Sequence, residues 1–242
     1  MRLTKQPVPL LSQMERVTLA DLQERFQGRI TVSGIQDEGN FVFVYPGMNS
    51  FGGRMNLNFS GRNNMIYIDQ NAPVEGEISF PANNAKAWIL GGADHLRLSA
   101  GVYEGAQFIW GFGSNSFGVR AWVFDHTSLH IGGDSLFSEG VTIRTSDHHS
   151  IIDLESMRQV NFPSDIMIGK HVWVAADVSI GKGVSIGDGS IVGAKAFVTK
   201  SIGSCEAWVG TPAKKVRDNC SWVGSHPALD NVGPYLKSVL SL

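Results

Sequence analysis

An aliphatic residue recurs at every sixth position near the C-terminal end of the chain, and Gly or Ala follows it in most cases. The positions are Ile168, Val174, Ile180, Ile186, Val192 and Val198. Helices repeat every 3.6 residues and strands every two, so neither element alone explains this period. A strand of about five residues plus a corner has a period of six, and three such sides close a triangular coil of about eighteen. The pattern predicts a β-solenoid in which residues eighteen apart stack on one another.

The same period is present upstream at Ile131, Phe137 and Ile143. A looser repeat precedes it, because GRNNMIYIDQNA from Gly61 is echoed by PANNAKAWILGGA from Pro81. Ordinary strands of a sandwich or barrel would instead alternate with a period of two, with turns every eight to twelve residues. The solenoid is therefore the preferred interpretation, and its coils are expected to begin well before the regular repeat.

The two ends of the chain have other patterns. A short amphipathic helix is predicted from Val17, with Gly28 as its stop. At the other end Tyr235, Val239 and Leu242 can share one helical face, and we expect this tail to cap or brace the end of the solenoid. The expected parts are an N-terminal extension over residues 1–30, a β-helix domain over 31–217 and a tail over 218–242.

Composition narrows the possible partners. The chain has 20 Lys and Arg against 22 Asp and Glu, and no basic run of five, which argues against nucleic acid or an anionic membrane surface. No apolar run is long enough for an integral membrane segment. Cys205 and Cys220 are the only cysteines, and the first residues lack the apolar core of an export signal. We therefore expect reduced thiols and a cytoplasmic location.

The six-residue repeat is interrupted after Ile143. Position 149 is a histidine, and the repeat resumes only at Ile168, so nineteen residues, 149–167, form an insertion. Insertions in a solenoid leave at a corner and often carry function. Histidine is a natural general base for removing a proton from a hydroxyl or amine, although a lone histidine on a loop is more often a surface residue.

Three segments resemble a known family: SDHHSIID, then VWVAADVSIGKGVSIGDGSIVGAKAFVTK, then VGTPAKKVR. They resemble the hexapeptide-repeat acetyltransferases, particularly the sugar O-acetyltransferases that modify bacterial surface polysaccharides. The resemblance covers about Gly61 to Arg217. It implies an all-β, left-handed parallel β-helix, to which the patterns at the two ends add short helical segments. It also implies a homotrimer and acetyl-CoA as acetyl donor. The implied acceptor is a hydroxyl of a surface glycan or of its precursor.

The resemblance also implies the catalytic base. In this family the histidine just before a (Pro or Ser)-Ile-x-Asp segment takes that role, and here His149 is followed by Ser150, Ile151 and Asp153. Many relatives have Pro where this chain has Ser150. The implied reaction is direct transfer, in which His149 removes the acceptor proton without a covalent acyl-enzyme.

Two further residues are implied near the reacting centre. Trp173 matches a tryptophan beside that centre, with packing against a neighbouring subunit as the alternative. Asp147 is expected either to orient the histidine or to cap a turn. If successive sides of the triangle begin at the six-residue positions, His149 and Trp173 lie at neighbouring corners about 16 Å apart. This separation favours a site between neighbouring chains.

The resemblance places the coenzyme along the outside of the prism. Small residues let the pantetheine arm approach the backbone, polar residues follow further along the arm, and basic residues lie near the phosphates. The matching positions are Ala176, Ala194, Thr199, Lys200, Lys214 and Arg217. The alternative for the cations is that they only solubilise the end of the solenoid.

Three other functions compete. An N-acetyltransferase of an amino-sugar nucleotide would use the same fold, cofactor and histidine. A γ-type carbonic anhydrase would need zinc between three histidines, but His126 and His130 are expected on outward positions that do not converge, and no metal is expected. A non-catalytic scaffold is the third possibility, and the insertion at His149 argues against it.

Overall fold

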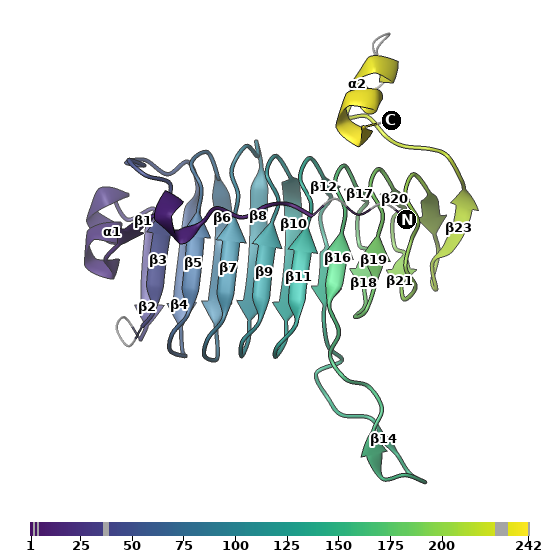
Figure 1. The fold of residues 1–242 in the computed structure, drawn as a ribbon, viewed down its shortest axis with the longest axis horizontal. Coiled ribbons are helices and arrows are strands. Elements are labelled where there is room, and N and C mark those ends of the chain that lie inside the picture. Colours follow the sequence, from purple (N-terminus) through teal and green to yellow (C-terminus); the bar gives the residue numbers. More distant parts are fainter. Residues whose placement is uncertain (2, 4, 36–38, 226–231, 242) are drawn as a thin grey trace.

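The six-residue pattern forms the predicted parallel β-helix, whose coils stack along one axis (Figure 1). The structure, a computed structural model, describes residues 1–242 apart from 2, 4, 36–38, 226–231 and 242. The first side of the solenoid is an eight-stranded sheet. In spatial order its strands are β1 (Glu15–Val17), β3 (Phe41–Val44), β5 (Met65–Ile68), β7 (Lys86–Ile89), β9 (Gln107–Trp110), β11 (Ser128–Ile131), β16 (Ile166–Ile168) and β19 (Ser185–Ile186).

A second sheet forms the rest of the coils. Its long N-terminal strands are β2 (Ile30–Gly34), β4 (Arg54–Phe59), β6 (Val74–Phe80), β8 (Leu96–Val102) and β10 (Asn115–Val123). Beyond β10 it divides into two columns. The second side continues through β12 (Leu136–Phe137), β17 (Trp173–Val174), β20 (Ile191–Val192), β22 (Ala207–Val209) and β23 (Lys214–Arg217). The third side consists of β13 (Val141–Arg144), β18 (Ser179–Ile180) and β21 (Phe197–Val198).

The predicted stacking of residues eighteen apart is confirmed in the last coils. The parallel register pairs Ile168 with Ile186, Val174 with Val192 and Ile180 with Val198. All six side chains point into the prism and are at most 2% exposed. Each buried aliphatic side chain contributes about 1.5–3 kcal/mol through the hydrophobic effect, so the column is a main source of stability.

The earlier coils are longer than the later ones. Ile68 pairs with Ile89, and Trp110 with Ile131, each 21 residues further on. The apparent repeat of the Asn-Asn pairs is therefore offset by one residue from the true register. Asn63 and Asn84 are equivalent, and both have a left-handed backbone with φ of 56° and 61°. Asn tolerates this conformation better than most residues, which explains its place at the corner.

The insertion leaves the prism where the sequence predicts it. Ile131 of β11 pairs with Ile168 of β16, so one coil contains 37 residues, nineteen more than its neighbour. The extra residues form an arm that projects from the solenoid and ends in a small hairpin (Figure 1). The hairpin strands are β14 (Ile152–Asp153) and β15 (Arg158–Gln159).

The predicted N-terminal helix is present as α1 (Leu19–Arg25). Thr18 caps it by accepting a hydrogen bond from the backbone N–H of Asp21, as N-cap residues do. Leu22 and Phe26 are buried against the first coils, and the side chain of Leu19 lies outside the described part. Before the helix, a short 3-10 turn (Leu11–Gln13) ends an extended segment that runs along the solenoid (Figure 1).

Of the two expected roles of the tail, capping or bracing the solenoid end, the arrangement corresponds to bracing. The tail does contain a helix, α2 (Val232–Leu240), but this helix lies beside the last coils, and the β22–β23 hairpin occupies the end (Figure 1). Leu240 is the buried residue of α2 and lies opposite Gly189, which has no side chain to exclude it. Leu242 lies outside the described residues.

Glycines in the corner after the first side allow the coils to stack closely. A Cβ added to Gly132 would lie 2.5 Å from the carbonyl group of Gly169 in the next coil, where only backbone atoms could yield. We expect Gly132→Ala to lower the free energy of unfolding by about 1–3 kcal/mol, as overpacking does. Urea or thermal unfolding would measure this. Gly224→Ala is the matched control, since a Cβ there meets nothing within 4 Å, and equal stability of the two variants would contradict the packing argument.

Candidate active site

The arm is held at its base by one asparagine. The side-chain amide of Asn161 donates to the Asp147 carboxylate and to the backbone carbonyl of His149, each at 2.8 Å. Its side-chain oxygen accepts from the backbone N–H of Ile151 at 2.6 Å. These bonds join the outgoing and returning strands of the arm. Asn161 thereby fixes the backbone at His149 and at Ile151.

Asp147 interacts with a lysine of the next coil. Its carboxylate is 2.5 Å from Lys182 Nζ, which also donates to the Asn161 carbonyl at 2.9 Å. The hydrogen bond from Lys182, followed by that from Asn161, lowers the pKa of Asp147. Within the described residues the bonds of this carboxylate go to Lys182 and Asn161 and not to the His149 imidazole. The geometry thus gives Asp147 the role of anchoring the arm to the solenoid, which neither sequence alternative anticipated.

His149 lies on the exposed base of the arm. Its ring meets that of His148 edge to face, with 5.0 Å between centroids. His148 in turn packs against Phe124 of the solenoid at 5.2 Å. The neighbouring histidine is therefore held against the prism, whereas the His149 imidazole is open to solvent and can meet an incoming molecule.

Trp173 lies at a different corner from His149. It opens β17 on the second side and is half-buried. The arm that begins at His149 leaves the solenoid at the corner between β13 and β16. Within one chain, the whole first side therefore lies between His149 and Trp173. This topology agrees with the sequence argument that one chain does not bring them together.

The residues matched to the coenzyme follow the third side and the end of the solenoid. Ala176 and Ala194 occupy equivalent turns in successive coils, since the backbone N–H of Lys195 donates to the Ala176 carbonyl at 2.9 Å. Thr199 and Lys200 follow β21 at the opposite end of the same side. The structure thus places these four residues around one face of the last coils.

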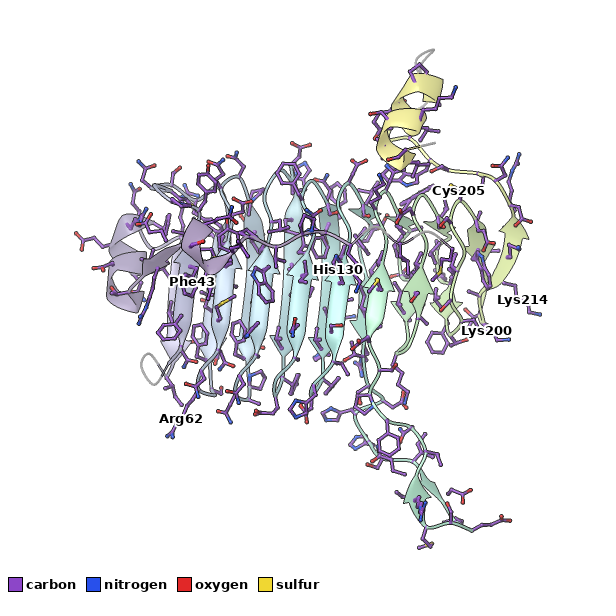
Figure 2. The ribbon with its side chains drawn as sticks, in the orientation of Figure 1. Phe43, Arg62, His130, Lys200, Cys205 and Lys214 are labelled. Atoms are coloured by element: carbon purple, nitrogen blue, oxygen red, sulfur yellow. The ribbon has the colours of Figure 1, made fainter. Side chains whose placement is uncertain are left out.

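The end hairpin brings basic residues toward this face. Its turn contacts the corner of Ala194, because the Thr211 hydroxyl donates to the Lys195 carbonyl at 2.9 Å. Lys214 and Arg217 are exposed on β23, and Figure 2 shows Lys214 and Lys200 both toward the β23 end of the solenoid.

Lys215, between the two, is neutralised by acidic neighbours. Its ammonium lies 2.8 Å from Asp218 and 3.2 Å from Glu206, and the hydrogen bond with Asp218, followed by that with Glu206, raises the pKa of Lys215. Lys214 and Arg217 are therefore better placed to receive phosphates than Lys215 is.

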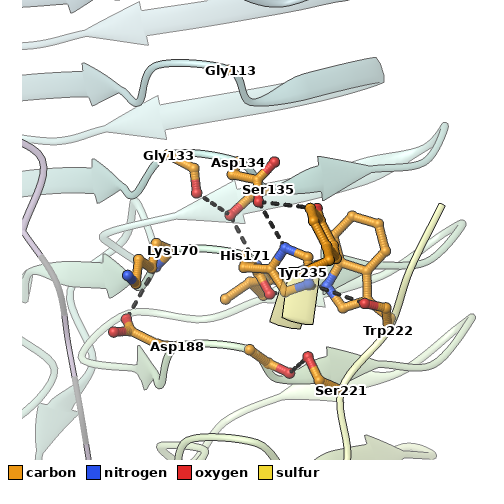
Figure 3. Close-up of polar contacts among 12 residues, drawn as sticks. Gly113, Gly133, Asp134, Ser135, Lys170, His171, Asp188, Ser221, Trp222 and Tyr235 are labelled. Atoms are coloured by element: carbon orange, nitrogen blue, oxygen red, sulfur yellow. Dashed lines mark hydrogen bonds and ion pairs between the residues drawn. The ribbon is translucent and has the colours of Figure 1, made fainter. Parts of the chain in front are cut away.

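A second cluster at the corner before Trp173 has no signal in the sequence (Figure 3). His171 is buried, and its imidazole bonds with the Asp134 carboxylate through Nδ1 at 2.8 Å and with the Trp222 carbonyl through Nε2 at 3.0 Å. The Trp222 ring stacks on that imidazole at 4.6 Å and lies 6.3 Å from the Trp173 ring. Because these contacts join positions up to 51 residues apart, no local motif predicts them.

The histidines considered for zinc are dispersed. His126 lies in a turn, whereas His130 on β11 accepts a hydrogen bond from the backbone N–H of Gln6 at 2.7 Å. Burial lowers the pKa of His130. Among the described residues, no group of three or more His, Cys, Asp or Glu side chains is arranged to hold a metal ion. The helices of the described chain include none that is long and apolar enough to cross a membrane.

Comparison with known proteins confirms the predicted resemblance. Residues 165–200 match the model of the family described as bacterial transferase hexapeptide (six repeats). The chain is 39% identical over 106 residues to a polysialic acid O-acetyltransferase of Escherichia coli O1:K1 / APEC, a match that covers 44% of this chain and 34% of that protein. It is 29% identical over 128 residues to the polysialic acid O-acetyltransferase of Neisseria meningitidis, covering 52% of this chain and 60% of that protein.

A solved structure shows the same architecture over most of the chain. The crystal structure of the polySia specific acetyltransferase NeuO superposes with a TM-score of 0.77 at 28% identity, covering 89% of this chain and 99% of that one. The left-handed parallel β-helix predicted from the resemblance is therefore confirmed. The two curated sequence matches span one third and just under two thirds of those relatives' lengths.

The contact between Asp147 and Lys182 gives a test of the arm's anchor. We expect Lys182→Met to increase amide hydrogen exchange in residues 146–163 by up to about fivefold, since an exposed ion pair contributes at most about 1 kcal/mol. Because the pair lowers the pKa of Asp147, its contribution is complete above the carboxyl's unfolded pKa of about 3.9 and is lost as pH falls through the lower folded value.

Lys200→Met is the matched control for this exchange experiment. Lys200 lies eighteen residues on, one coil further along the same corner. It should leave exchange in the arm unchanged. Equal protection of the arm in the wild type and in Lys182→Met would show that the ion pair does not anchor it.

Proposed function

We propose that this chain is an acetyl-CoA-dependent O-acetyltransferase that acts on a sugar hydroxyl of a bacterial surface glycan or of its precursor. The observation that supports this most strongly is the placement of His149 at the exposed base of an arm on a hexapeptide-repeat β-helix. The relatives reported above are O-acetyltransferases, which favours an oxygen acceptor over the amine of an amino-sugar nucleotide. Acetyl-CoA is a cytoplasmic metabolite, so we place the reaction in that compartment.

In the proposed reaction His149 acts as general base. It removes the proton from the sugar hydroxyl while the oxygen attacks the thioester carbonyl. The tetrahedral intermediate then expels the CoA thiolate, which takes up the proton held by His149, and the acetyl ester and CoA are released. Asn161 contributes by holding the His149 backbone, and Lys182 by tying the arm to the next coil through Asp147.

The donor would lie along the third side. Ala176 and Ala194 leave room for the pantetheine arm beside the backbone, and Thr199 and Lys200 would contact it further along. Lys214 and Arg217 on the end hairpin would face the phosphates, where their charges have natural partners. This order places the thioester near the coils that carry Trp173 and leaves the nucleotide at the end of the solenoid.

We further propose that the working unit is a homotrimer with each site between two chains. The arm has six exposed apolar side chains: Ile151, Ile152, Leu154, Met157, Val160 and Phe162. Leu154 is 83% exposed, which is costly for an apolar residue unless another surface covers it. A neighbouring chain that covers the arm would also bring its own Trp173 toward His149, which one chain does not do.

An acceptor screen tests the reaction. Purified protein would be supplied with acetyl-CoA and with polysialic acid, neutral galactosides or an amino-sugar nucleotide, and release of the CoA thiol would be followed. We expect transfer to at least one hydroxyl acceptor. Transfer only to the amine, or to none of these acceptors, would contradict the proposal.

The two adjacent histidines provide a matched pair of variants. We expect His149→Asn to reduce turnover on the acceptor from the screen by about 10²–10⁴-fold, as loss of a general base does, with acetyl-CoA affinity within about twofold. His148→Asn should reduce turnover by less than about tenfold, because that ring packs against Phe124. Similar losses in both variants would contradict the assignment of His149.

A further inference from the structure

The C-terminal tail is fixed to the solenoid next to Trp173. Three consecutive tail residues bond to backbone groups of the last coils: Cys220 N–H to the Cys205 carbonyl, Ser221 hydroxyl to the Gly189 carbonyl, and Trp222 indole N–H to the His171 carbonyl, each at 2.9 Å. Successive bonds of this kind leave little freedom of position. The Trp222 ring is therefore held in one place.

One face of the Trp222 ring is used for packing. It stacks on the His171 imidazole with an angle of 10° between the planes. The Tyr235 ring of α2 meets the same imidazole edge to face, with 5.8 Å between the ring centroids (Figure 3). His171 is fully buried by these contacts. The imidazole thus serves as a support beneath the indole, and it is itself held by Asp134.

The Trp222 ring also lies close to Trp173, a residue matched to the reacting centre. It lies 6.3 Å from the Trp173 ring at an angle of 44°, and both indoles remain half-buried although the tail is docked. The Asp134 carboxylate and the Tyr235 ring on the same corner are 51% and 41% exposed. A wall of aromatic faces with nearby carboxylate and hydroxyl groups suits a sugar ring, which has apolar C–H faces and hydroxyl edges.

We propose that Trp222 is an acceptor-positioning residue, which together with Trp173 forms the wall against which the sugar acceptor lies. This inference rests on the proposed O-acetyltransferase function and extends it to a residue of the tail. The residues matched to acetyl-CoA lie around the third side and on the end hairpin, and not at the corner before Trp173 where Trp222 packs. Trp222 therefore affects the acceptor and not the donor.

Steady-state kinetics on three variants tests this role, with the best acceptor from the screen. Trp222→Leu keeps an apolar side chain and removes the aromatic face, so we expect the acceptor KM to rise about five- to tenfold while acetyl-CoA KM stays within about twofold. Trp222→Phe keeps an aromatic face and should restore the acceptor KM to within about twofold of the wild type. Ser221→Ala removes one anchoring bond of the tail without touching the wall and should leave both KM values unchanged.

The outcomes separate this inference from the function on which it rests. Two results would show that the tail is only structural: an unchanged acceptor KM in Trp222→Leu, or an equal fall of kcat in all three variants without a change in KM. Either result would overturn the inference and leave the transferase function standing. A wild-type protein that transfers acetyl to no acceptor would overturn the proposed function itself, and the inference with it. Thermal unfolding of each variant identifies any loss caused by misfolding.

Discussion

The structure depends on the stacking of aliphatic side chains inside a three-sided coil. The coils that begin at Ile168 and Ile186 bury an Ile or Val from every side, and parallel hydrogen bonds hold them in register. Since the interior of these coils has room for one aliphatic side chain per side, any added length there must leave at a corner. The arm after β13 and the tail after β23 both satisfy this constraint, because each lies outside the prism and leaves the interior column intact.

The same constraint explains why the candidate catalytic and acceptor-binding residues lie at the corners. Between corners, side chains alternate between the filled interior and a flat outer face, which gives little opportunity for a concave site. At the corners the backbone turns through left-handed residues such as His171, with φ of 54°, and side chains from successive coils converge there. One corner carries His149 and the ion pair between Asp147 and Lys182. The next corner carries Trp173 and the docked tail. A site made from both needs two chains, and the exposed apolar arm is consistent with that arrangement.

The sequence predicted the last coils well because one rule, an aliphatic residue every six positions, is nearly uninterrupted there. It predicted less of the first coils, where strands such as β4 and β6 are longer and each coil has 21 residues, so the six-residue period is hidden. The insertion and its histidine were visible as a gap in the period. Asn161 and Lys182 were not, because their partners are fixed only when the arm folds back on the next coil. Trp222 was hidden for the same reason, since its contact with His171 joins positions 51 residues apart.

Complementation between two inactive variants tests most directly whether His149 and Trp173 act together across a seam between chains. His149→Asn and Trp173→Ala chains would be produced separately, mixed, dissociated and reassembled, and acetyl transfer would be compared with that of each variant alone. If each site takes its histidine from one chain and its tryptophan from the next, random mixing in a trimer restores about a quarter of the sites. Activity that stays at the level of the separate variants after reassembly into trimers would contradict the account.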